Sequence, residues 1–237
     1  MKKENVLING CSRGMGYDLF QKLKTKYNVF GLSSVITNDK NIFHYDPLKS
    51  PKLEKALILR MKDCKIDHVI HCSGGGLKYY DKFLELDKLT DLFNINFFSI
   101  YEINKALIKN KIKNKKLNII MIGSIAAFEV KASIGYSAAK SVLLNYNKNL
   151  ASNFVKDNVV SKLLVPCSFV STRGSMTRLK INNIKIFKKL EQLIPDKKMQ
   201  NSEDLVKFIQ LLLKKESDLL NGTYISLSNL ESGSIFL

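Results

Sequence analysis

Short apolar runs alternate along the chain with longer segments in which apolar residues recur at helical spacing. The short runs indicate strands and the periodic segments indicate amphipathic helices. The pattern predicts strands over residues 5–10, 28–33, 41–46, 67–76, 117–124, 159–166 and 222–227. It predicts helices over residues 16–27, 50–64, 88–109, 135–156 and 202–215. Ser50, which precedes Pro51, and Ser202 are the expected N-caps of two of these helices.

The central strands are apolar on both faces, as in "LNIIMIGS" at 117–124. Strands of this kind that alternate with helices form parallel sheets with helices on both faces. The predicted fold class is therefore α/β, a doubly wound parallel sheet of about seven strands. We expect residues 1–237 to form a single domain. The weakly patterned basic segment 173–201 is expected as an insertion above the carboxyl ends of the strands, where ligands bind in such folds.

The net charge of +17 admits two interpretations. Basic patches would bind nucleic acid or an acidic partner. Alternatively, genome composition enriches lysine throughout, and the lysines lie on solvated helix faces. The densest basic run, residues 109–118, has no interleaved aromatic residues for base stacking. Nucleic acid is therefore not an expected partner, whereas attraction of an anionic substrate stays open.

The four cysteines lack the spacing of a metal site. Cys11, Cys64, Cys72 and Cys167 form no CxxC pair and have no accompanying histidine cluster, so no metal is expected and the pattern fits a reducing cytoplasm. Cys11 and Cys72 are expected to be small buried residues. No apolar run reaches the roughly 20 residues of a membrane span, and the first apolar run is far shorter than the about 7–15 residues of a signal peptide core. We therefore expect a cytoplasmic protein without a membrane segment.

A glycine cluster lies between the first predicted strand and the first predicted helix. Gly10, Gly14 and Gly16 have the spacing G-x-x-x-G-x-G. Glycines let a loop turn tightly and approach a pyrophosphate, and the following helix N-terminus offers N–H groups and a positive dipole end. In this strand-turn-helix context, the cluster predicts a dinucleotide-binding loop.

The end of the second strand indicates which nicotinamide cofactor is preferred. An acidic residue there binds the ribose 2′-OH of NAD, but this chain has Leu32-Ser33-Ser34. Arg13, inside the glycine loop, would face a 2′-phosphate. NADP(H) is therefore favoured, with NAD(H) as the alternative. Asp46, at the next strand end, is either a turn residue or an acceptor for the adenine amino group.

Three further residues meet at the carboxyl ends of the strands. Ser124 ends the buried strand, and Tyr136 and Lys140 lie one helical turn apart on the following helix. A tyrosine can deliver a proton to a carbonyl oxygen as hydride reaches the carbon. A nearby ammonium and the positive charge of a nicotinamide would favour the phenolate and lower the tyrosine pKa from about 10. A serine hydroxyl can polarise the same oxygen. Each residue alone is typical of a turn, a packing aromatic or a solvated charge, but together behind a glycine loop they indicate carbonyl reduction or the reverse alcohol oxidation.

These motifs together resemble the short-chain dehydrogenase/reductase family in its one-domain form, a Rossmann fold. The resemblance covers nearly the whole chain. It is carried by "NGCSRGMG" (9–16), "HCSGG" (71–75), "NINFFS" (94–99), the S…Y-x-x-x-K motif, "PCSFVST" (166–172) and "NGTYISL" (221–227).

The resemblance implies a role for each matched position. The catalytic set would be Asn96, Ser124, Tyr136 and Lys140, in which Asn96 kinks its helix and holds a water that links Lys140 to bulk solvent. Thr172 would bind the nicotinamide carboxamide. The expected cofactor-binding residues are Gly10, Ser12, Arg13, Gly14, Met15, Gly16, Ser33, Asp46, Pro47, Cys72, Ser73, Gly74, Tyr136, Lys140, Pro166, Val170 and Thr172.

The chain also departs from the family pattern. Tyr136 follows Ser124 by 12 residues, one fewer than is usual, so the loop between them is expected to be tightened. The other departures are Asn9 for threonine, His71-Cys72-Ser73 for Asn-Asn-Ala, Cys167 or Ser168 for glycine, and Asn229-Leu230 for Gly-Gly. All four catalytic positions are filled, so a working enzyme is expected.

The substrate is expected to be a small carbonyl or alcohol compound. Ala126, Ala127, Phe128 and the segment 173–201, with Arg173 and Arg178 among its cations, would line its pocket. This basic mouth favours a 3-oxoacyl group on an acidic carrier protein or a keto-sugar, including a nucleotide-linked one. The alternatives are an epimerase of the same family and a non-catalytic NADP-binding regulator.

By the same resemblance, a homotetramer or homodimer would form through the two long helices. Leu144, Leu150 and Phe154 are either exposed at that interface or part of the core.

Overall fold

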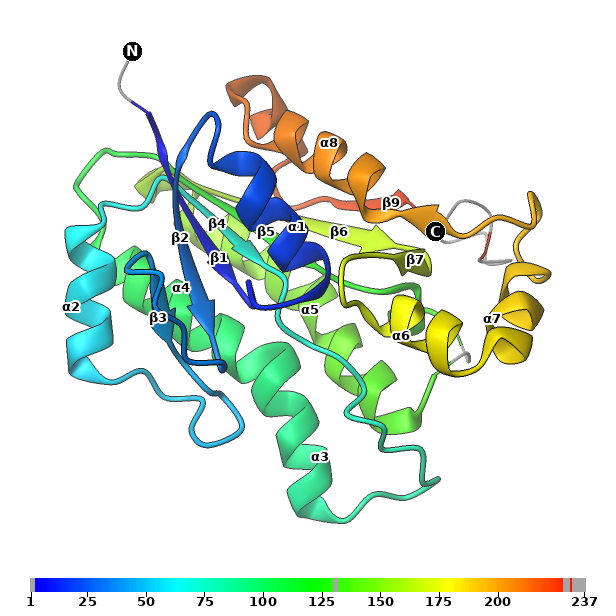
Figure 1. Cartoon of the computed structure of the whole chain (residues 1–237). Helices are drawn as coiled ribbons and strands as arrows, with labels where there is room; N and C mark the ends of the chain where they lie inside the picture. The colour runs from blue at the N-terminus through cyan, green and yellow to red at the C-terminus, as the bar shows by residue number, and fades with distance from the viewer. Residues whose placement is uncertain (1–2, 130–131, 228–230, 232–237) are drawn as a thin grey trace.

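The computed structural model describes residues 3–129, 132–227 and 231, and within them the predicted doubly wound α/β fold is confirmed (Figure 1). Seven parallel strands form one sheet in the order β3-β2-β1-β4-β5-β6-β9. These strands are β1 (Asn5–Asn9), β2 (Asn28–Ser33), β3 (Ile42–His44), β4 (His68–His71), β5 (Leu117–Ile122), β6 (Val159–Pro166) and β9 (Tyr224–Leu227). The helices are α1 (Gly14–Leu23), α2 (Lys55–Asp63), α3 (Leu86–Phe93), α4 (Ser99–Asn110), α5 (Ile134–Phe154), α6 (Ser175–Asn182), α7 (Ile184–Glu191) and α8 (Ser202–Leu212).

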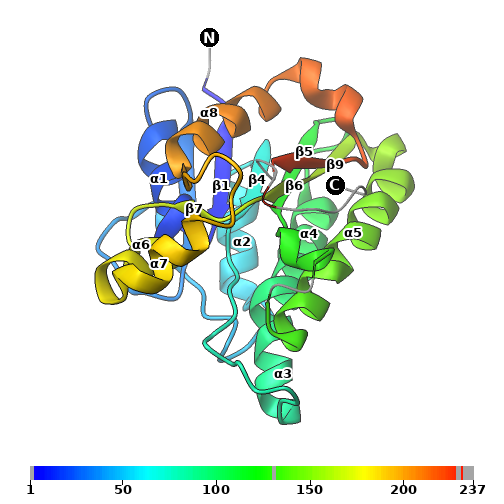
Figure 2. The ribbon, with the colours of Figure 1, turned by 90° about the vertical axis from the view of Figure 1, so that its right-hand side faces the viewer.

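Helices cover both faces of the sheet, as Figures 1 and 2 show. Helices α1 and α8 pack on one face, over a core that includes Ile8, Ile70 and Ile120. Helices α2, α4 and α5 pack on the other face, over a core that includes Leu7 and Ile119. Side chains of one strand alternate between these two cores, which explains why the central strands are apolar on both faces.

The strand order reverses between β1 and β4, because β1 pairs with β2 on one side and with β4 on the other. The chain leaves these two strands in opposite directions across the sheet. The crevice at such a switch point, beyond the carboxyl ends of the strands, is where ligands bind in open α/β sheets. The candidate site therefore lies beside the residues that follow β1 and β4.

Two predicted N-caps are wrong. Helix α2 begins at Lys55, because the N–H of Ser50 donates to the Asp46 carbonyl in a turn and the Ser50 hydroxyl accepts from the N–H of Lys52. Helix α8 is capped by Asn201, whose side chain accepts from the N–H groups of its first turn. Ser202 is the first helical residue instead.

The long helix predicted over residues 88–109 is interrupted. Helices α3 and α4 are joined by a π-helical turn, η1 (Asn94–Phe98). The turn wraps an extra residue into the helix and buries Asn94, Ile95 and Asn96. π-bulges of this kind are frequent at functional sites.

The insertion at 173–201 contains α6 and α7, which lie beyond the carboxyl end of β6 (Figure 1). They enclose a small core of their own around Phe187, Ile194 and Met199. A two-stranded parallel sheet of β7 (Phe169–Val170) and β8 (Gln200–Asn201), which the sequence pattern does not predict, ties both ends of the insertion together.

The candidate interface residues of α5 belong to the core. Leu150 is buried, and Leu144 and Phe154 are half-buried against the core between the sheet and α4 and α5. Near α4 and α5, the aromatic side chains of Phe98 and Tyr101 are exposed. None of the helices in the described residues is long and apolar enough to cross a membrane.

A polar row interrupts the core under α8. Lys162 of β6 is fully buried, and its ammonium donates to Asn118 Oδ1 at 2.9 Å, to Ser217 Oγ at 2.9 Å and to the Leu212 carbonyl at 3.3 Å. Asp218 Oδ1 lies 3.8 Å from the same nitrogen. The ammonium thus caps the C-terminal end of α8, where the helix dipole favours positive charge. Burial nevertheless lowers the pKa of Lys162 to about 8.

This lowered pKa gives a test of the network. The folded state favours the neutral amine, so Lys162 makes the wild-type protein gain stability as pH rises from about 8 toward the unfolded-state value of about 10.4. We expect Lys162→Met to remove this gain and, at pH 7, to lower the free energy of unfolding by about 1–3 kcal/mol, because Asn118 and Ser217 lose a buried partner. Chemical denaturation at pH 7, 8 and 9.5 measures both effects. Lys214→Met, at an exposed lysine after α8, is the control. Identical pH dependence in wild type and Lys162→Met would contradict the assignment.

Candidate active site

The glycine loop turns back on the end of β4. Gly10 has φ +86°, and a Cβ there would lie 2.6 Å from the Ser73 nitrogen. The N–H groups of Gly10 and Cys11 donate to the Leu32 carbonyl at 2.9 and 3.2 Å, which joins the loop to β2. A side chain at position 10 would separate β1 from the segment after β4, so glycine is required there.

The same loop packs directly beneath the first turn of α1. A Cβ on Gly16 would lie 2.0 Å from the Gly10 carbonyl oxygen, whereas a Cβ on Gly14 would have no neighbour nearer than 3.7 Å. The backbone is therefore tightly packed at Gly16 and less tightly at Gly14, whose N–H donates to the Thr172 carbonyl at 2.7 Å. The first N–H groups of an α-helix have no acceptor within the helix and carry the positive end of its dipole. These features fit an anionic group such as the pyrophosphate of a dinucleotide.

The other residues predicted to hold the adenosine half of a cofactor are distributed around this loop. Arg13 is exposed at the N-cap of α1, and Ser12 is half-buried before it. Ser33 is buried, and its hydroxyl bonds to the backbone of Val35 in a turn. Asp46 accepts from the N–H of Leu48 at 3.1 Å, which matches the turn role that was the alternative to an adenine contact.

The segment after β4 follows the loop closely. The Cys72 N–H donates to the Asn9 carbonyl at 2.8 Å, and the Asn9 amide donates to Ser73 Oγ at 2.7 Å. Burial raises the pKa of the Cys72 thiol well above its usual range, so Cys72 is a packing residue and not a nucleophile. Asn9 and Ser73, which stand where the family pattern has other residues, thus support each other.

The buried His71, which stands where the family pattern has asparagine, continues this network. His71 Nε2 lies 2.9 Å from Asn104 Oδ1, and Asn104 in turn donates to the Tyr146 hydroxyl at 3.2 Å. Burial lowers the pKa of His71 to about 4, so the imidazole is neutral. The network connects β4 to α4 and to α5, the helix that carries Tyr136 and Lys140.

Asn96 is fully buried in the π-helical turn η1. Its amide donates to the Leu92 carbonyl at 2.8 Å and to the Gly75 carbonyl at 3.1 Å, and its Oδ1 accepts from the Gly75 N–H at 3.0 Å. The side chain therefore fixes the glycine-rich segment after β4 against the interrupted helix.

Lys140 is buried on α5, and its ammonium donates to the Ile122 carbonyl at 3.0 Å, at the end of β5. A Cβ on Gly74 would lie 3.0 Å from Lys140 Nζ and 2.5 Å from Asn96 Oδ1. Gly74, with φ +140°, therefore has its backbone between these two side chains. Burial lowers the pKa of Lys140 to about 8.

The Tyr136 hydroxyl faces the Ser124 side chain. Ser124 follows β5 and η2 (Ile125–Ala127) begins after it, and its Oγ accepts from the Ala126 N–H at 3.2 Å. Burial raises the pKa of Tyr136, and the contact with Ser124 acts in the opposite direction. The predicted lowering of this pKa by Lys140 together with the charge of a bound nicotinamide stays a prediction.

The segment after β6 reaches back to the glycine loop. The Gly14 N–H donates to the Thr172 carbonyl at 2.7 Å, so Thr172 lies on the first turn of α1. Val170 is in β7 and packs against the core of the insertion, and Pro166 ends β6. Asp18, which was not a predicted site residue, accepts from the Thr172 N–H at 3.1 Å. Its position one turn beyond Gly14 on α1 is the only sequence signal for this contact.

The predicted substrate-pocket residues are only partly exposed. Ala126 is buried, and Phe128 packs against the core and against the ring of Tyr224, with 5.5 Å between ring centroids. Arg178 donates to the Arg173 carbonyl. Ala126 therefore offers little exposed surface, whereas Ala127 and Phe128 are half-buried. Their place in a substrate pocket stays a prediction.

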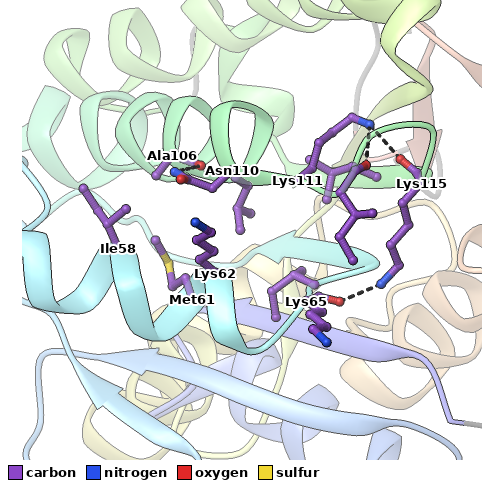
Figure 3. Close-up of a pocket in the computed structure, with 12 residues that line it drawn as sticks. Ile58, Met61, Lys62, Lys65, Ala106, Asn110, Lys111 and Lys115 are labelled. Carbon is purple, nitrogen blue, oxygen red and sulfur yellow. Dashed lines mark hydrogen bonds between the residues drawn. The ribbon is translucent and has the colours of Figure 1, made fainter.

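A lysine-rich hollow between α2 and α4 lies at the opposite end of the strands (Figure 3). Its floor is apolar, and the ammonium groups of Lys111 and Lys115 donate to the backbone carbonyls of Lys115 and Lys65. Lys115 also pairs with Asp67 at 2.6 Å. Two of its cations are therefore engaged within the protein, and none of the predicted site residues line the hollow.

The arrangement of motifs matches a known family. The family model of the short chain dehydrogenases matches residues 51–181, more than half of the 237 residues. The chain belongs to the short chain dehydrogenase family. It is therefore an oxidoreductase of a family that binds nicotinamide cofactors and acts on small molecules.

Curated relatives extend the similarity over nearly the whole chain. A 3-oxoacyl-[acyl-carrier-protein] reductase FabG of Buchnera aphidicola subsp. Schizaphis graminum (strain Sg) is 25% identical, over 95% of this chain and 96% of its own length. The reductase of the same name from the subspecies Acyrthosiphon pisum (strain APS) is 28% identical, over 94% of each chain. The aldohexose dehydrogenase AldT of Thermoplasma acidophilum in ligand-free form shares the fold, with a TM-score of 0.84 at 17% identity over 99% of this chain and 96% of that one.

The packing at Gly74 gives a matched test of this dehydrogenase site. We expect Gly74→Ala to lower turnover at least tenfold more than Gly75→Ala, because the new methyl group would displace the side chain of Asn96 or Lys140 by about an ångström. Gly75 is the control because its φ of +143° gives the same backbone strain as the +140° of Gly74, but a Cβ there meets nothing within 4 Å. Turnover and thermal unfolding of both variants are measured together. Equal loss of turnover in the two would show that the contacts of Gly74 are unimportant.

Proposed function

We propose that this dehydrogenase catalyses NADP(H)-dependent reduction of a carbonyl to an alcohol, or the reverse. The observation that carries the proposal is the facing pair of Ser124 and Tyr136, which lies with the buried Lys140 and Asn96 at the same sheet edge as the glycine loop. In this proposal residues 1–237 act as one dinucleotide-binding domain.

The side chains have distinct roles in the proposed reaction. The Tyr136 hydroxyl gives its proton to the substrate oxygen in reduction and removes it in oxidation. Ser124 donates a hydrogen bond to the same oxygen and stabilises the charge that develops there. Lys140 and Asn96 lie behind this pair, where they hold the backbone after β4 and β5 in place and connect the site to solvent protons.

Burial sets the protonation states of the pair. The raised pKa of Tyr136 keeps the phenol protonated, which suits the proton donor of a reduction. The Lys140 pKa of about 8 leaves the ammonium charged at neutral pH, although it loses charge within the weakly basic range. A bound nicotinamide cofactor supplies or accepts the hydride and, when oxidised, adds a positive charge that favours the phenolate.

The preference for NADP(H) is supported by charges near the ribose end of the site. Arg13 is exposed at the start of α1, and β2 ends in Ser33 without a carboxylate. A solved protein of this fold, BdcA, is in complex with NADPH and has a TM-score of 0.75 to this chain. A solved 4-hydroxyisoleucine dehydrogenase is complexed with NADH and has a TM-score of 0.82. The fold therefore accommodates either cofactor, and the proposed preference for NADP(H) depends on Arg13.

The proposed substrate is a 3-oxoacyl group on an acidic carrier protein. The two Buchnera relatives bear the name of such reductases and span nearly the whole chain, and the net charge of +17 suits an acidic partner. The filled Tyr136 and Lys140 positions favour this enzyme over a non-catalytic regulator. We further propose a cytoplasmic homotetramer or homodimer, with the exposed Phe98 and Tyr101 as candidates for the interface.

The catalytic assignment is tested by Tyr136→Phe. Removal of the hydroxyl deletes the proton donor, so we expect a loss of about 10²–10⁴-fold in kcat with NADPH affinity kept within about threefold. NADPH oxidation with a 3-oxoacyl thioester measures kcat, and fluorescence titration measures NADPH binding. Tyr27→Phe, directly before β2 at the opposite end of the strands, is the control. Normal turnover by Tyr136→Phe would show that another group delivers the proton.

The cofactor preference is tested by Arg13→Ala. Loss of the guanidinium removes charge-assisted hydrogen bonds to a 2′-phosphate, so KM for NADPH is expected to rise about tenfold or more while KM for NADH stays within about twofold. Steady-state kinetics with both cofactors measure the change, and Lys22→Ala on the exposed face of α1 is the control. Equal effects on both cofactors would leave Arg13 without a role in discrimination.

A further inference from the structure

The loop from Cys167 to Thr172, here called the β6–α6 loop, is held at both ends by carboxylates. At its start, the N–H and hydroxyl of Ser168 donate to Glu231 Oε2 at 2.6 Å and Oε1 at 2.9 Å. At its end, the Thr172 N–H donates to Asp18 Oδ2 at 3.1 Å. Hydrogen bonds to ionised acceptors are roughly twice as strong as neutral ones, so these are the firmest attachments of the loop.

Each carboxylate connects the loop to a different part of the fold. Asp18 belongs to α1, and its Oδ2 also accepts from the Ser202 hydroxyl at the start of α8. Glu231 follows β9, which pairs with β6 at the sheet edge. The loop is therefore fixed to the glycine-loop helix at one end and to the chain beyond the edge strand at the other.

The middle of the loop is fixed as well. The Thr177 hydroxyl donates to the Ser171 carbonyl at 2.6 Å and lies 3.2 Å from the Ser171 N–H. Phe169 and Val170 pair with β8, and the Cys167 thiol donates to Gln200 Oε1 at 3.2 Å. The loop thus has a set course over the first turn of α1, where the Gly14 N–H donates to the Thr172 carbonyl.

Both acids reach the loop from distant parts of the sequence. Asp18 is 154 residues from Thr172, and Glu231 is 63 residues from Ser168. Ser168, one of the two residues at the position where the family resemblance expects glycine, supplies two donors to Glu231.

We propose that Asp18 and Glu231 are positioning residues that hold the β6–α6 loop in its cofactor-binding course before the cofactor arrives. The inference rests on the proposed function and on the contacts that Val170 and Thr172 are expected to make with the cofactor. A loop that occupies its binding course only part of the time weakens the apparent affinity by that fraction. Loss of either carboxylate should therefore weaken cofactor binding more than it slows the reaction of the bound enzyme.

The test compares Asp18→Ala, Asp18→Asn, Glu231→Ala and Glu231→Gln in the full chain. We expect each alanine variant to weaken NADPH binding about tenfold or more and to raise KM for NADPH by a similar factor, while kcat at saturating NADPH stays within about twofold. The amide variants should recover part of the affinity, because an amide oxygen still accepts one N–H. Asp204→Asn, an exposed acid on α8 outside the loop, is the control.

A second readout does not depend on cofactor. Arg173 is exposed directly after the loop, so release of the loop should speed tryptic cleavage there by about tenfold in the free alanine variants, in proportion to the open population. Thermal unfolding without cofactor should match that of the control within a few degrees.

The outcomes separate the inference from the proposed function. NADPH affinity and cleavage at Arg173 that stay at wild-type values in both alanine variants would overturn the inference, as would affinity that falls only in step with thermal stability. A wild-type protein that binds neither NADPH nor NADH would instead contradict the proposed function, and the cleavage rates would still decide whether the carboxylates hold the loop.

Discussion

The direct packing of backbone against backbone at the carboxyl ends of β1 and β4 is the constraint on which the site depends. Gly10 meets the Ser73 nitrogen, and Gly16 meets the Gly10 carbonyl oxygen, with no room for a methyl group at either position. At Gly74 the backbone packs equally closely, here against the side chains of Asn96 and Lys140. Because neighbouring parallel strands end at one edge, these contacts bring the glycine loop and the proposed catalytic residues into one small volume. A side chain at any of these three glycines would disturb the contact between the glycine loop, the segment after β4 and the proposed catalytic residues.

Burial dominates the chemistry of the groups held there. Tyr136 and Lys140 are both withdrawn from water, and both are shifted toward their neutral forms, upward for the phenol and downward for the ammonium. The contact with Ser124 offsets the effect of burial on Tyr136 only in part. The Lys140 ammonium donates to the Ile122 carbonyl.

Departures from the family pattern are compensated by neighbours that are distant in the sequence. Asn9 and Ser73 replace the usual residues and bond to each other at 2.7 Å. Cys167 or Ser168 replaces glycine, and the two donors of Ser168 meet Glu231 at 2.6 and 2.9 Å. A substitution that adds polar groups to a loop is tolerated when a neighbouring side chain forms hydrogen bonds with those groups.

The sequence by itself determined the fold class, the seven main strands, the glycine loop and the family, because apolar periodicity and short motifs are local properties. Motif spacing and chemistry also grouped Ser124, Tyr136 and Lys140 as a proposed catalytic set, and the family resemblance added Asn96. The tertiary structure decided the helix starts at Lys55 and Ser202, the contact of Phe128 with Tyr224, the buried Lys162 network, and the contacts of Asp18 and Glu231 with the β6–α6 loop. These depend on which side chains meet across the fold: Asp18 and Thr172 are 154 residues apart, and no local pattern records such a contact.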